Sequence, residues 1–373
     1  MSQQQRTILI VAGEASGDQH GADLVKAINA IAPRYRFVGI GGDKMQAAGV
    51  TLLYHIRDFA ILGISEVIRH LPFLRRVLKK LQQKLREIDA VILIDYPGFN
   101  LRLARLAHEA GKKVIYYICP QLWAWGERRV HQIRKYVDLA LVIFEFEERF
   151  YRQRGVTAYW VGHPLVDQLQ EIAVKREEFF QQNNLPKDKP LVTLLPGSRR
   201  QEVDRLLPLM VAAMAPLATE VSIAIGQSPT LDVSFYQSHL KPNMHLLVGQ
   251  THALMKHADV AIVASGTATL ELGYFQTPMV VVYRVSPITY WLGKRLVTIE
   301  NIALVNIIAG KRIVPELIQE EASAEQIQKT LMRLLTDKVY YHQMKQALAQ
   351  IPTKLGPPGA SKRAAQKIVE LVE

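Results

Sequence analysis

Thr7-Ile-Leu-Ile-Val-Ala12 decides the fold, because this short aliphatic run ends in a glycine-containing loop, Gly13-Glu-Ala-Ser-Gly-Asp18. A continuous apolar run of this length predicts a parallel strand that is buried on both faces. Similar runs recur with helix-length stretches between them, at 37–40, 90–94, 113–118, 139–144, 191–195, 221–225, 245–248, 260–264 and 279–283. Strands that alternate with helices predict βαβ units with right-handed crossovers. Two such series predict an α/β protein with two doubly wound, Rossmann-like domains.

Composition supports a globular chain of about two domains. The 373 residues are 49% hydrophobic and 21% charged, which excludes a disordered or fibrous protein. Lys and Arg number 46 against 34 Asp and Glu, and the net charge of +12 favours an acidic partner. The single cysteine, Cys119, excludes an intramolecular disulfide and fits a reducing compartment. We find no apolar run that could span a bilayer or form a signal peptide, so we expect a cytoplasmic protein with peripheral membrane contact.

Two loops in the first half carry candidate catalytic residues, because doubly wound sheets bind ligands beyond the carboxyl ends of their strands. In the first loop, Glu14 is placed to meet a substrate, whereas Ser16 or Asp18 could either contact the acceptor or cap the next helix. Asp95 ends a second run, in Ile94-Asp-Tyr-Pro-Gly-Phe-Asn100. Its carboxylate could accept the proton of a substrate hydroxyl, or it could accept backbone N–H groups in an Asx-turn.

Two loops in the second half predict a phosphate site. Gly197, Ser198 and Arg199 join a strand to a helix, a pattern that is typical of phosphate binding but also of an exposed basic loop. The second loop, Ala264-Ser-Gly-Thr-Ala-Thr-Leu-Glu271, places Ser265, Gly266 and Thr267 in a similar cradle. Glu271 could accept ribose hydroxyls or pair with the helix dipole. A carboxylate on one domain and a diphosphate site on the other, facing a central cleft, predict group transfer from a nucleotide-linked donor to a hydroxyl.

Residues 64–85 predict a basic amphipathic helix. Its apolar residues recur at helical spacing: Ile64, Val67, Ile68, Leu71, Leu74, Leu78, Leu81 and Leu85. Cations stand between them: Arg69, Arg75, Arg76, Lys79, Lys80 and Lys84. The pattern fits a helix on an anionic membrane, and equally a core helix with a solvated basic face. Pro72 could break this helix or start a second one.

The remaining features bear on partners and on the chain's end. Trp123 and Trp125 could stack on a sugar or acyl chain, or pack their loop onto the core. Histidine spacing predicts no metal site, and no nucleic-acid-binding motif is present. Ser323 predicts the cap of one C-terminal helix and Ser361 the cap of the last.

The chain resembles the lipid A disaccharide synthase family of bacterial glycosyltransferases. The matching stretches run in order over nearly the whole length, at 11–18, 37–40, 63–67, 94–100, 123–125, 194–199, 264–271, 294–296 and 306–310. Each is modest alone, and the ordered set is specific. Some relatives carry a second Asp at the position of Gly98, so this chain offers a single carboxylate there.

The resemblance implies a GT-B fold with an acceptor domain at 1–165, a UDP-sugar domain at 166–345 and a helix at 346–373 returning to the first domain. It implies inverting transfer of 2,3-diacylglucosamine from its UDP ester to 2,3-diacylglucosamine 1-phosphate (lipid X), without a cofactor. The enzyme would be peripheral on the cytoplasmic face of the inner membrane and is compatible with a homodimer. By matched position, Glu14, Asp95, Arg199 and Asn306 correspond to family residues linked to activity, with Asn306 on the donor.

We assign Asp95 as base, with Glu14 as the alternative, and Val67, Ile68, Leu71, Leu74, Arg75 and Arg76 as membrane or acceptor contacts. Two other functions stay open at this point. One is a related enzyme acting on another UDP-sugar, such as an epimerase or a transferase with a soluble acceptor. The other is a basic nucleic-acid-binding protein.

Overall fold

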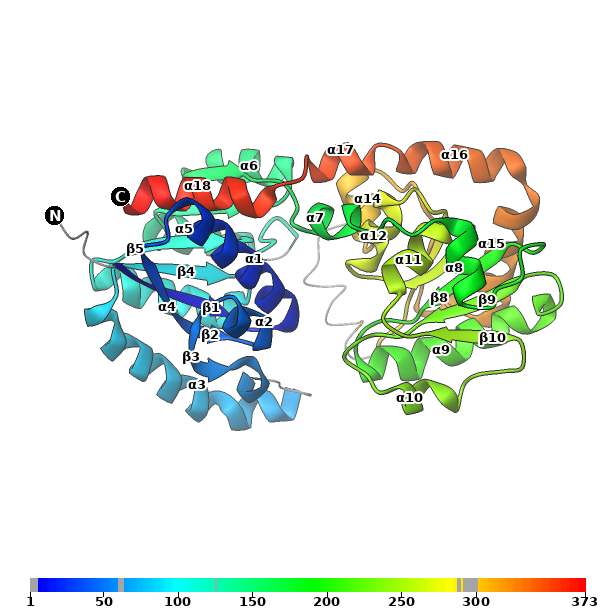
Figure 1. The fold of residues 1–373 in the computed structure, drawn as a ribbon, viewed down its shortest axis with the longest axis horizontal. Helices are drawn as coiled ribbons and strands as arrows, with labels where there is room; N and C mark the ends of the chain where they lie inside the picture. Colours follow the sequence, from blue (N-terminus) through cyan, green and yellow to red (C-terminus); the bar gives the residue numbers. More distant parts are fainter. Residues whose placement is uncertain (1–5, 60–63, 125, 287–289, 291–300) are drawn as a thin grey trace. The chain divides into compact units, whose positions relative to one another are not determined.

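The chain forms two parallel β-sheets with helices on both faces of each (Figure 1). The computed structural model describes residues 6–59, 64–124, 126–286, 290 and 301–373, and for 64–70 it describes the backbone alone. Contacts between Cα atoms divide the chain into a first unit, Met1–Pro164 with Leu355–Glu373, and a second unit, Leu165–Lys354. The sequence prediction placed the corresponding changes of domain at residues 165 and 346.

Within the described residues, the first unit contains a seven-stranded sheet in which every pairing is parallel. The strands are β1 (Arg6–Ala12), β2 (Tyr35–Gly41), β3 (Thr51–His55), β4 (Ala90–Ile94), β5 (Lys113–Tyr117), β6 (Leu139–Val142) and β7 (Ala158–Trp160). Their order, β3-β2-β1-β4-β5-β6-β7, is doubly wound, because the chain proceeds outward from β1 and then crosses back to β4. The predicted runs matched five of these strands. The edge strands β3 and β7 were missed, since they are short and only partly buried.

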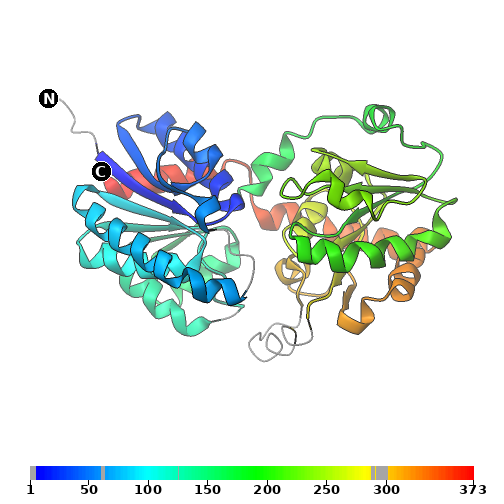
Figure 2. The same ribbon diagram turned by 90° about the horizontal axis from the view of Figure 1, so that it is seen from below.

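Helices cover both faces of this sheet (Figures 1 and 2). They are α1 (Ala15–Ile31), α2 (Asp43–Ala47), α3 (Ile64–Lys84), α4 (Pro97–Glu109), α5 (Val130–Tyr136), α6 (Glu145–Arg152) and α18 (Ala360–Val372). On one face Ile8 and Ile10 join the core of α1 and α18, and on the other Leu9 and Val11 join that of α3, α4 and α5. Both faces of β1 are therefore dry, which explains its unbroken apolar sequence.

The second unit contains, in its described residues, a six-stranded parallel sheet of order β10-β9-β8-β11-β12-β13. Its strands are β8 (Leu191–Leu195), β9 (Ser222–Gly226), β10 (Met244–Leu247), β11 (Val260–Ala264), β12 (Met279–Tyr283) and β13 (Glu316–Ile318). The predicted runs matched all of these except β13, which has three residues at the sheet edge.

The helices of the second unit are α7 (Leu165–Gln170), α8 (Arg176–Gln182), α9 (Arg200–Met214), α10 (Val233–Gln237), α11 (Thr251–His257), α12 (Ala268–Tyr274), α14 (Leu304–Ala309), α15 (Ala324–Thr336), α16 (Lys338–Leu348) and α17 (Ile351–Leu355). Right-handed crossovers in opposite directions place α9 and α11 on opposite faces of the sheet. Phe179 and Phe180 of α8 pack with Leu254 of α11 over β8, β9 and β10, whereas α15 contacts α9 and β11.

Three local predictions have different outcomes. The helix of residues 64–85 is one continuous helix, α3, with Pro72 inside it. Ser323 caps α15 as predicted, since its hydroxyl accepts the N–H of Gln326 at 3.2 Å. The prediction for Ser361 was wrong, because α18 begins at Ala360 after Gly359, whose φ of +90° is a conformation that glycine adopts without strain.

Candidate active site

The loops after β1 and β4 lie side by side at the carboxyl edge of the first sheet. The two strands pair in parallel with Ala12 opposite Ile94, so the loops leave the sheet at the same level. A side chain at Gly13 would place its Cβ 2.3 Å from the Tyr96 ring, so only glycine permits this approach. Glu14 follows at the start of α1, exposed and without a capping hydrogen bond from its side chain. The structure therefore brings the two carboxylates predicted to act in catalysis to one edge.

Asp18 has a structural task at this edge. Its buried carboxylate accepts the backbone N–H groups of Gly42 at 2.6 Å, Met45 at 3.0 Å and Lys44 at 3.1 Å. These bonds satisfy the open end of α2, so the helix that Asp18 caps is α2 rather than its own α1. Ser16 is exposed on the first turn of α1. An acceptor contact by either residue stays a prediction.

The Asp95 loop is held in a strained conformation. Asp95 and Tyr96 have φ values of +45° and +48°, which cost a non-glycine residue about 1–2 kcal/mol each. The carbonyl of Asp95 accepts the Tyr116 hydroxyl at 2.7 Å and the Asn100 amide at 2.8 Å. Asn100 also donates to the carbonyl of Ile94 at 3.1 Å. Strain that is held by several hydrogen bonds is typical of functional loops, because it aims a side chain that a relaxed turn would misplace.

The carboxyl group of Asp95 is tuned toward proton transfer. Its pKa is raised to about 6, first because the surrounding protein desolvates the carboxyl and second because the Glu14 carboxylate lies near it. Solvent still reaches the residue, so a substrate can reach it too. A base with a pKa near the working pH combines a useful ionised fraction with affinity for a proton. The sequence predicted the acid but not this tuning.

Glu147 is a buried acid at the same edge that the sequence prediction missed. Its side chain is fully buried on α6 and accepts the indole N–H of Trp123 at 2.9 Å. Burial, together with the nearby charge of Asp95, raises the pKa of Glu147 to about 7 against three hydrogen bonds that lower it. The available signal was a Glu at the third position of a helix that starts at a strand's carboxyl end. Trp125 lies outside the described residues.

The loop at Gly197–Arg199, here called the arginine loop, binds a carboxylate of the protein itself. Glu202 of α9 accepts the N–H groups of Ser198 at 3.1 Å and Arg199 at 3.3 Å, and its other oxygen lies 3.4 Å from the Arg199 guanidinium. Gly197 has φ of +112°, and a Cβ there would lie 2.4 Å from the Glu202 carboxylate. The loop thus presents N–H groups and a guanidinium to a carboxylate, a donor set that also suits phosphate.

The loop after β11 leaves the same sheet edge as the arginine loop, since β11 pairs with β8 in parallel, with Val263 opposite Leu195. Ser265 donates its hydroxyl to the carbonyl of Ile302 at 3.0 Å. Gly266 and Thr267 follow, and Thr267 is exposed. Glu271 lies mostly buried one turn into α12, with His252 Nε2 at 3.8 Å.

Asn306 is fully buried and uses its amide within the protein. It donates to Glu316 at 2.7 Å and accepts both N–H groups of the Ile313–Val314 turn, at 2.8 and 2.9 Å. Glu316 in turn accepts the N–H of Ile302 at 2.9 Å, and the carbonyl of Ile302 accepts Ser265. Asn306 and Glu316 therefore support the segment that holds the β11 loop. A donor contact by Asn306 stays a prediction.

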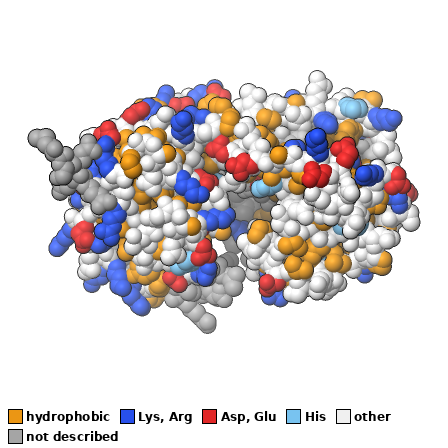
Figure 3. Space-filling model, viewed as in Figure 1, with side chains coloured by type: hydrophobic (Ala, Val, Ile, Leu, Met, Phe, Trp, Pro, Cys, Tyr) orange, Lys and Arg blue, Asp and Glu red, His pale blue; other side chains and the backbone are white. Residues whose placement is uncertain are grey.

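Helix α3 combines a core-facing stripe with a basic outer face. Val77, Leu81 and Leu85 are buried in the core of the first unit, and Leu74 packs against it. This favours the core-helix alternative for the second half of α3. On the other side Arg75, Arg76, Lys79 and Lys80 are exposed, and Leu71 is partly buried. Figure 3 shows Lys and Arg side chains along the lower left margin, where α3 lies in Figure 1. The side chains of Val67 and Ile68 lie outside the described residues.

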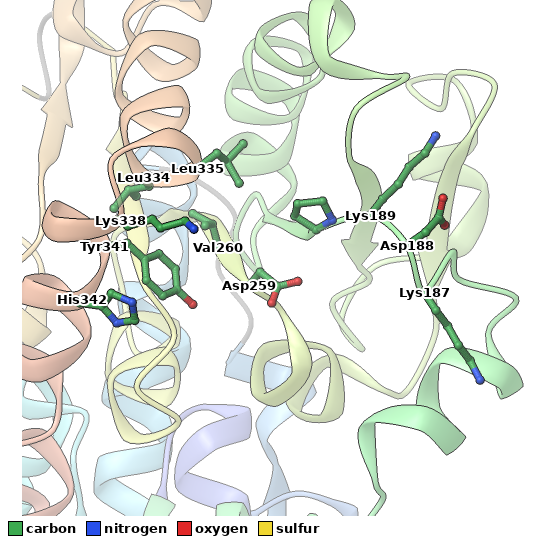
Figure 4. A pocket seen from close by; sticks show the side chains of 11 residues that line it. Lys187, Asp188, Lys189, Asp259, Val260, Leu334, Leu335, Lys338, Tyr341 and His342 are labelled. Carbon is green, nitrogen blue, oxygen red and sulfur yellow. The ribbon is translucent and has the colours of Figure 1, made fainter.

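A pocket of about 590 Å³ lies at the opposite edge of the second sheet (Figure 4). Asp259 and Pro190 line it just before β11 and β8 begin, whereas ligands of doubly wound sheets bind where strands end. Its acid is already engaged, because Asp259 accepts from Arg176 at 2.7 Å and from the N–H of Leu191 at 2.8 Å. Figure 4 shows Lys187 and Lys189 directed away from Asp259. We assign this pocket no part in the reaction.

The described residues contain neither a metal-binding cluster nor a membrane-spanning helix. No group of three His, Cys, Asp or Glu side chains in them could hold a metal ion. No helix in the same residues is both long and apolar enough to cross a bilayer.

Comparison with known proteins decides the family. The family model described as lipid-A-disaccharide synthetase matches residues 8–368. The chain belongs to this family. The lipid-A-disaccharide synthase of Trichlorobacter lovleyi is 42% identical over 99% of this chain and 98% of the relative. That of Myxococcus xanthus is also 42% identical, over 98% and 97%. The family resemblance inferred from the motifs is thereby confirmed, and the motif at 294–296 lies outside the described residues.

Solved structures support the same fold class. The UDP-GlcNAc 2-epimerase from Neisseria meningitidis bound to UDP-GlcNAc has a TM-score of 0.64 at 13% identity, covering 98% of this chain and 100% of that one. The calicheamicin glycosyltransferase CalG4 has a TM-score of 0.59 at 16% identity, covering 99% and 98%. These confirm the predicted GT-B fold and no more. As a member of this family, the chain is a glycosyltransferase that forms the lipid A disaccharide, and the match favours neither the epimerase nor the nucleic-acid alternative.

Proposed function

We propose that the chain transfers 2,3-diacylglucosamine from UDP-2,3-diacylglucosamine to lipid X, giving the β-1,6-linked disaccharide 1-phosphate and UDP. The 6-hydroxyl oxygen of lipid X attacks the anomeric carbon of the donor and forms the new C–O bond. The bond from that carbon to the phosphate oxygen breaks, and UDP departs with the electron pair. The observation that carries this proposal is the state of Asp95. Its backbone is held in a strained conformation at the sheet edge, and the pKa of its carboxyl is raised to about 6.

Asp95 takes the proton of the attacking hydroxyl. Its raised pKa makes it a stronger base than an ordinary aspartate, while it remains largely ionised above pH 6. Glu14 positions the acceptor and adds the second negative charge that keeps the Asp95 pKa high. Ser16 and Asp18 lie on the same helix start, where Asp18 holds the loop through α2.

The second unit binds the donor. Arg199, with the backbone of Gly197 and Ser198, takes the diphosphate and stabilises the charge that UDP gains on leaving. This requires the Glu202 carboxylate to give up its two N–H donors. Ser265, Gly266 and Thr267 line the donor side, and Glu271 accepts ribose hydroxyls. Asn306 acts through the segment that it supports with Glu316.

The test is UDP release from the donor with and without lipid X, in detergent micelles containing EDTA. We expect release that depends on lipid X and continues in EDTA. Release without lipid X would indicate hydrolysis or an epimerase-like reaction and would overturn the transfer. Loss of release in EDTA would overturn the metal-free mechanism.

The basic face of α3 supports peripheral docking on the anionic cytoplasmic face of the inner membrane. The described part of this face is cationic rather than apolar, so we assign most of the attraction to charge, about 1 kcal/mol per cation near the surface. The variant Arg75→Gln, Arg76→Gln, Lys79→Gln should lose co-sedimentation with anionic vesicles. A control with equal charge loss, Lys187→Gln, Lys241→Gln, Lys338→Gln, should retain it. Equal retention by both would remove α3 as the docking surface. A homodimer is a further expectation, which ultracentrifugation tests.

A further inference from the structure

Glu147 is an acid with no role in the proposed reaction, yet its burial is complete. One carboxylate oxygen accepts the Trp123 indole N–H at 2.9 Å, and the other accepts the N–H groups of Phe144 at 3.2 Å and Ile143 at 3.3 Å. Among the described residues no cation forms an ion pair with it. A carboxylate without a counter-ion is costly to bury. Its three charge-assisted hydrogen bonds offset that cost and fix the atoms that donate them.

These hydrogen bonds tie together the loops that follow two neighbouring strands. Trp123 lies in the loop after β5, and Phe144 ends the turn between β6 and α6. A second bond joins the same elements, because the Tyr151 hydroxyl of α6 donates to the carbonyl of Pro120 at 2.6 Å. The loop carrying Trp123 is thus anchored at both Pro120 and Trp123. Two anchors hold a short segment in one conformation, since each removes backbone freedom.

The anchored loop begins beside the proposed base. The N–H of Asp95 donates to the carbonyl of Tyr117 at 3.3 Å, and the Tyr116 hydroxyl donates to the carbonyl of Asp95 at 2.7 Å. Cys119 then donates back to the carbonyl of Tyr116 at 3.5 Å. Asp95 is also close enough for its charge to raise the pKa of Glu147.

The Trp123 ring is held at its indole N–H and against Phe146. Its N–H points inward to Glu147, and it meets Phe146 edge to face, with ring centroids 5.0 Å apart and planes at 79°. The ring is only partly buried. An indole held in this way offers a fixed apolar surface at little further entropic cost. Sugar rings and acyl chains both have apolar faces that suit such a surface.

We propose that Glu147 is a positioning residue that fixes Trp123 as an aromatic surface for the acylated sugar acceptor beside Asp95. The inference rests on the proposed function, which places the acceptor hydroxyl at Asp95. Glu147 touches no substrate itself. It acts through the indole N–H, and removing either partner of that bond has the same effect.

Kinetics of Glu147→Ala, Glu147→Gln and Trp123→Phe test the pair. Trp123→Phe keeps an aromatic ring but loses the N–H, and Glu147→Gln keeps an oxygen acceptor. We expect Trp123→Phe and Glu147→Ala each to raise the KM for lipid X about tenfold, the size of one hydrogen bond to a charged group. The KM for the UDP donor stays unchanged, the double variant is no worse than either single one, and Glu147→Gln restores most of the affinity.

Two matched controls separate positioning from general loosening. Trp160→Phe removes an indole N–H that donates to the carbonyl of Ile143 at 3.1 Å, in the same unit. Glu145→Ala removes an exposed acid from the same helix. Both should leave the KM for lipid X unchanged. The inference is overturned if Trp123→Phe leaves that KM unchanged, or if the donor KM rises equally. Trp123→Phe remains decisive if Glu147→Ala does not fold.

A fluorescence titration tests the contact without turnover. The chain has four tryptophans, so Trp125→Phe, Trp160→Phe, Trp291→Phe leaves Trp123 as the only one. Because burial raises the pKa of Glu147 to about 7, Trp123 emission should change with a midpoint near pH 7. Adding Glu147→Gln should abolish this change. A midpoint that persists in that variant, or no titration at all, contradicts the pairing.

The outcomes separate this inference from the proposed function. If Asp95→Asn keeps full turnover, the base assignment fails, while the titration of Trp123 still reports on the pair. If Asp95→Asn loses turnover but Trp123→Phe binds lipid X normally, only the inference about Glu147 fails.

Discussion

The carboxyl edges of the two sheets differ in how they treat charge. At the first edge two acids are desolvated: Glu147 is fully buried, and Asp95, although the residue keeps access to solvent, is desolvated enough that the pKa of its carboxyl rises to about 6. At the second edge the main charged group is exposed, since the Arg199 side chain retains 75% of its solvent accessibility. Desolvation tunes a proton acceptor, because it disfavours the ionised carboxylate and so raises the pKa. Exposure suits capture of a charged nucleotide, which a guanidinium achieves with fixed geometry and permanent charge.

The largest expected effect on this comparison comes from neutralising Asp95, the desolvated base. Asp95→Asn should lower kcat roughly 100- to 10,000-fold, the usual range for a general base. UDP affinity, measured by calorimetry, should not change, because we assign it to the other unit. Asp204→Asn, an exposed acid on α9, is the control and should keep full activity. Nearly full turnover by Asp95→Asn would transfer the role of base to Glu14.

The exposed arginine gives the matching test of the second edge. Arg199→Gln should weaken UDP binding roughly 10- to 100-fold, since a hydrogen bond to a charged group contributes about 1.5–3 kcal/mol. Arg199→Lys should recover part of the loss, because it keeps the charge but not the planar donor pair. Arg205→Gln, also exposed and on α9, the helix that Arg199 precedes, is the control. Unchanged UDP affinity in Arg199→Gln would leave the diphosphate to the β11 loop.

The pH dependence of kcat/KM tests whether Asp95 at the first edge is the base. Since the pKa of Asp95 is raised to about 6, its basic form is lost as the pH falls through 6, and kcat/KM should drop about tenfold per pH unit below that point. Glu14→Gln removes a negative charge that raises this pKa, so the midpoint should move to lower pH. Glu220→Gln, an exposed acid elsewhere, should leave it in place. If the midpoint of the pH profile does not move in Glu14→Gln, another group limits the rate.

The smallest expected effect concerns Glu202, whose carboxylate accepts the N–H groups of the arginine loop. Glu202→Gln removes a charge that competes with phosphate for the N–H groups of Ser198 and Arg199. UDP should bind roughly twofold to fivefold more tightly, matching the 0.3–1 kcal/mol of a charge at a helix end. Calorimetry with Asp204→Asn as control measures it. Weaker UDP binding would mean that Glu202 mainly orders the loop.

The sequence alone was enough for the fold class, the interior strands and most loops of the candidate site. Interior parallel strands must be apolar on both faces, so runs such as 90–94 and 191–195 can be recognised as strands from the sequence. The edge strands β3, β7 and β13 could not be recognised, because they are short or only partly buried, whereas the edge strand β10 was predicted from its apolar run. The motif order also identified the family, which the family model confirmed.

Only the tertiary structure decided what individual polar side chains contact. Asp18 caps α2 rather than its own helix, and Pro72 lies inside an unbroken helix. The amide of Asn306 forms hydrogen bonds with a turn and with Glu316. Glu147, which the sequence did not single out, is buried against Trp123, 24 positions away. Apolar periodicity is local, so neighbouring residues reveal it. Hydrogen-bond partners and desolvation depend on which distant segments the fold brings together, and no local pattern encodes them.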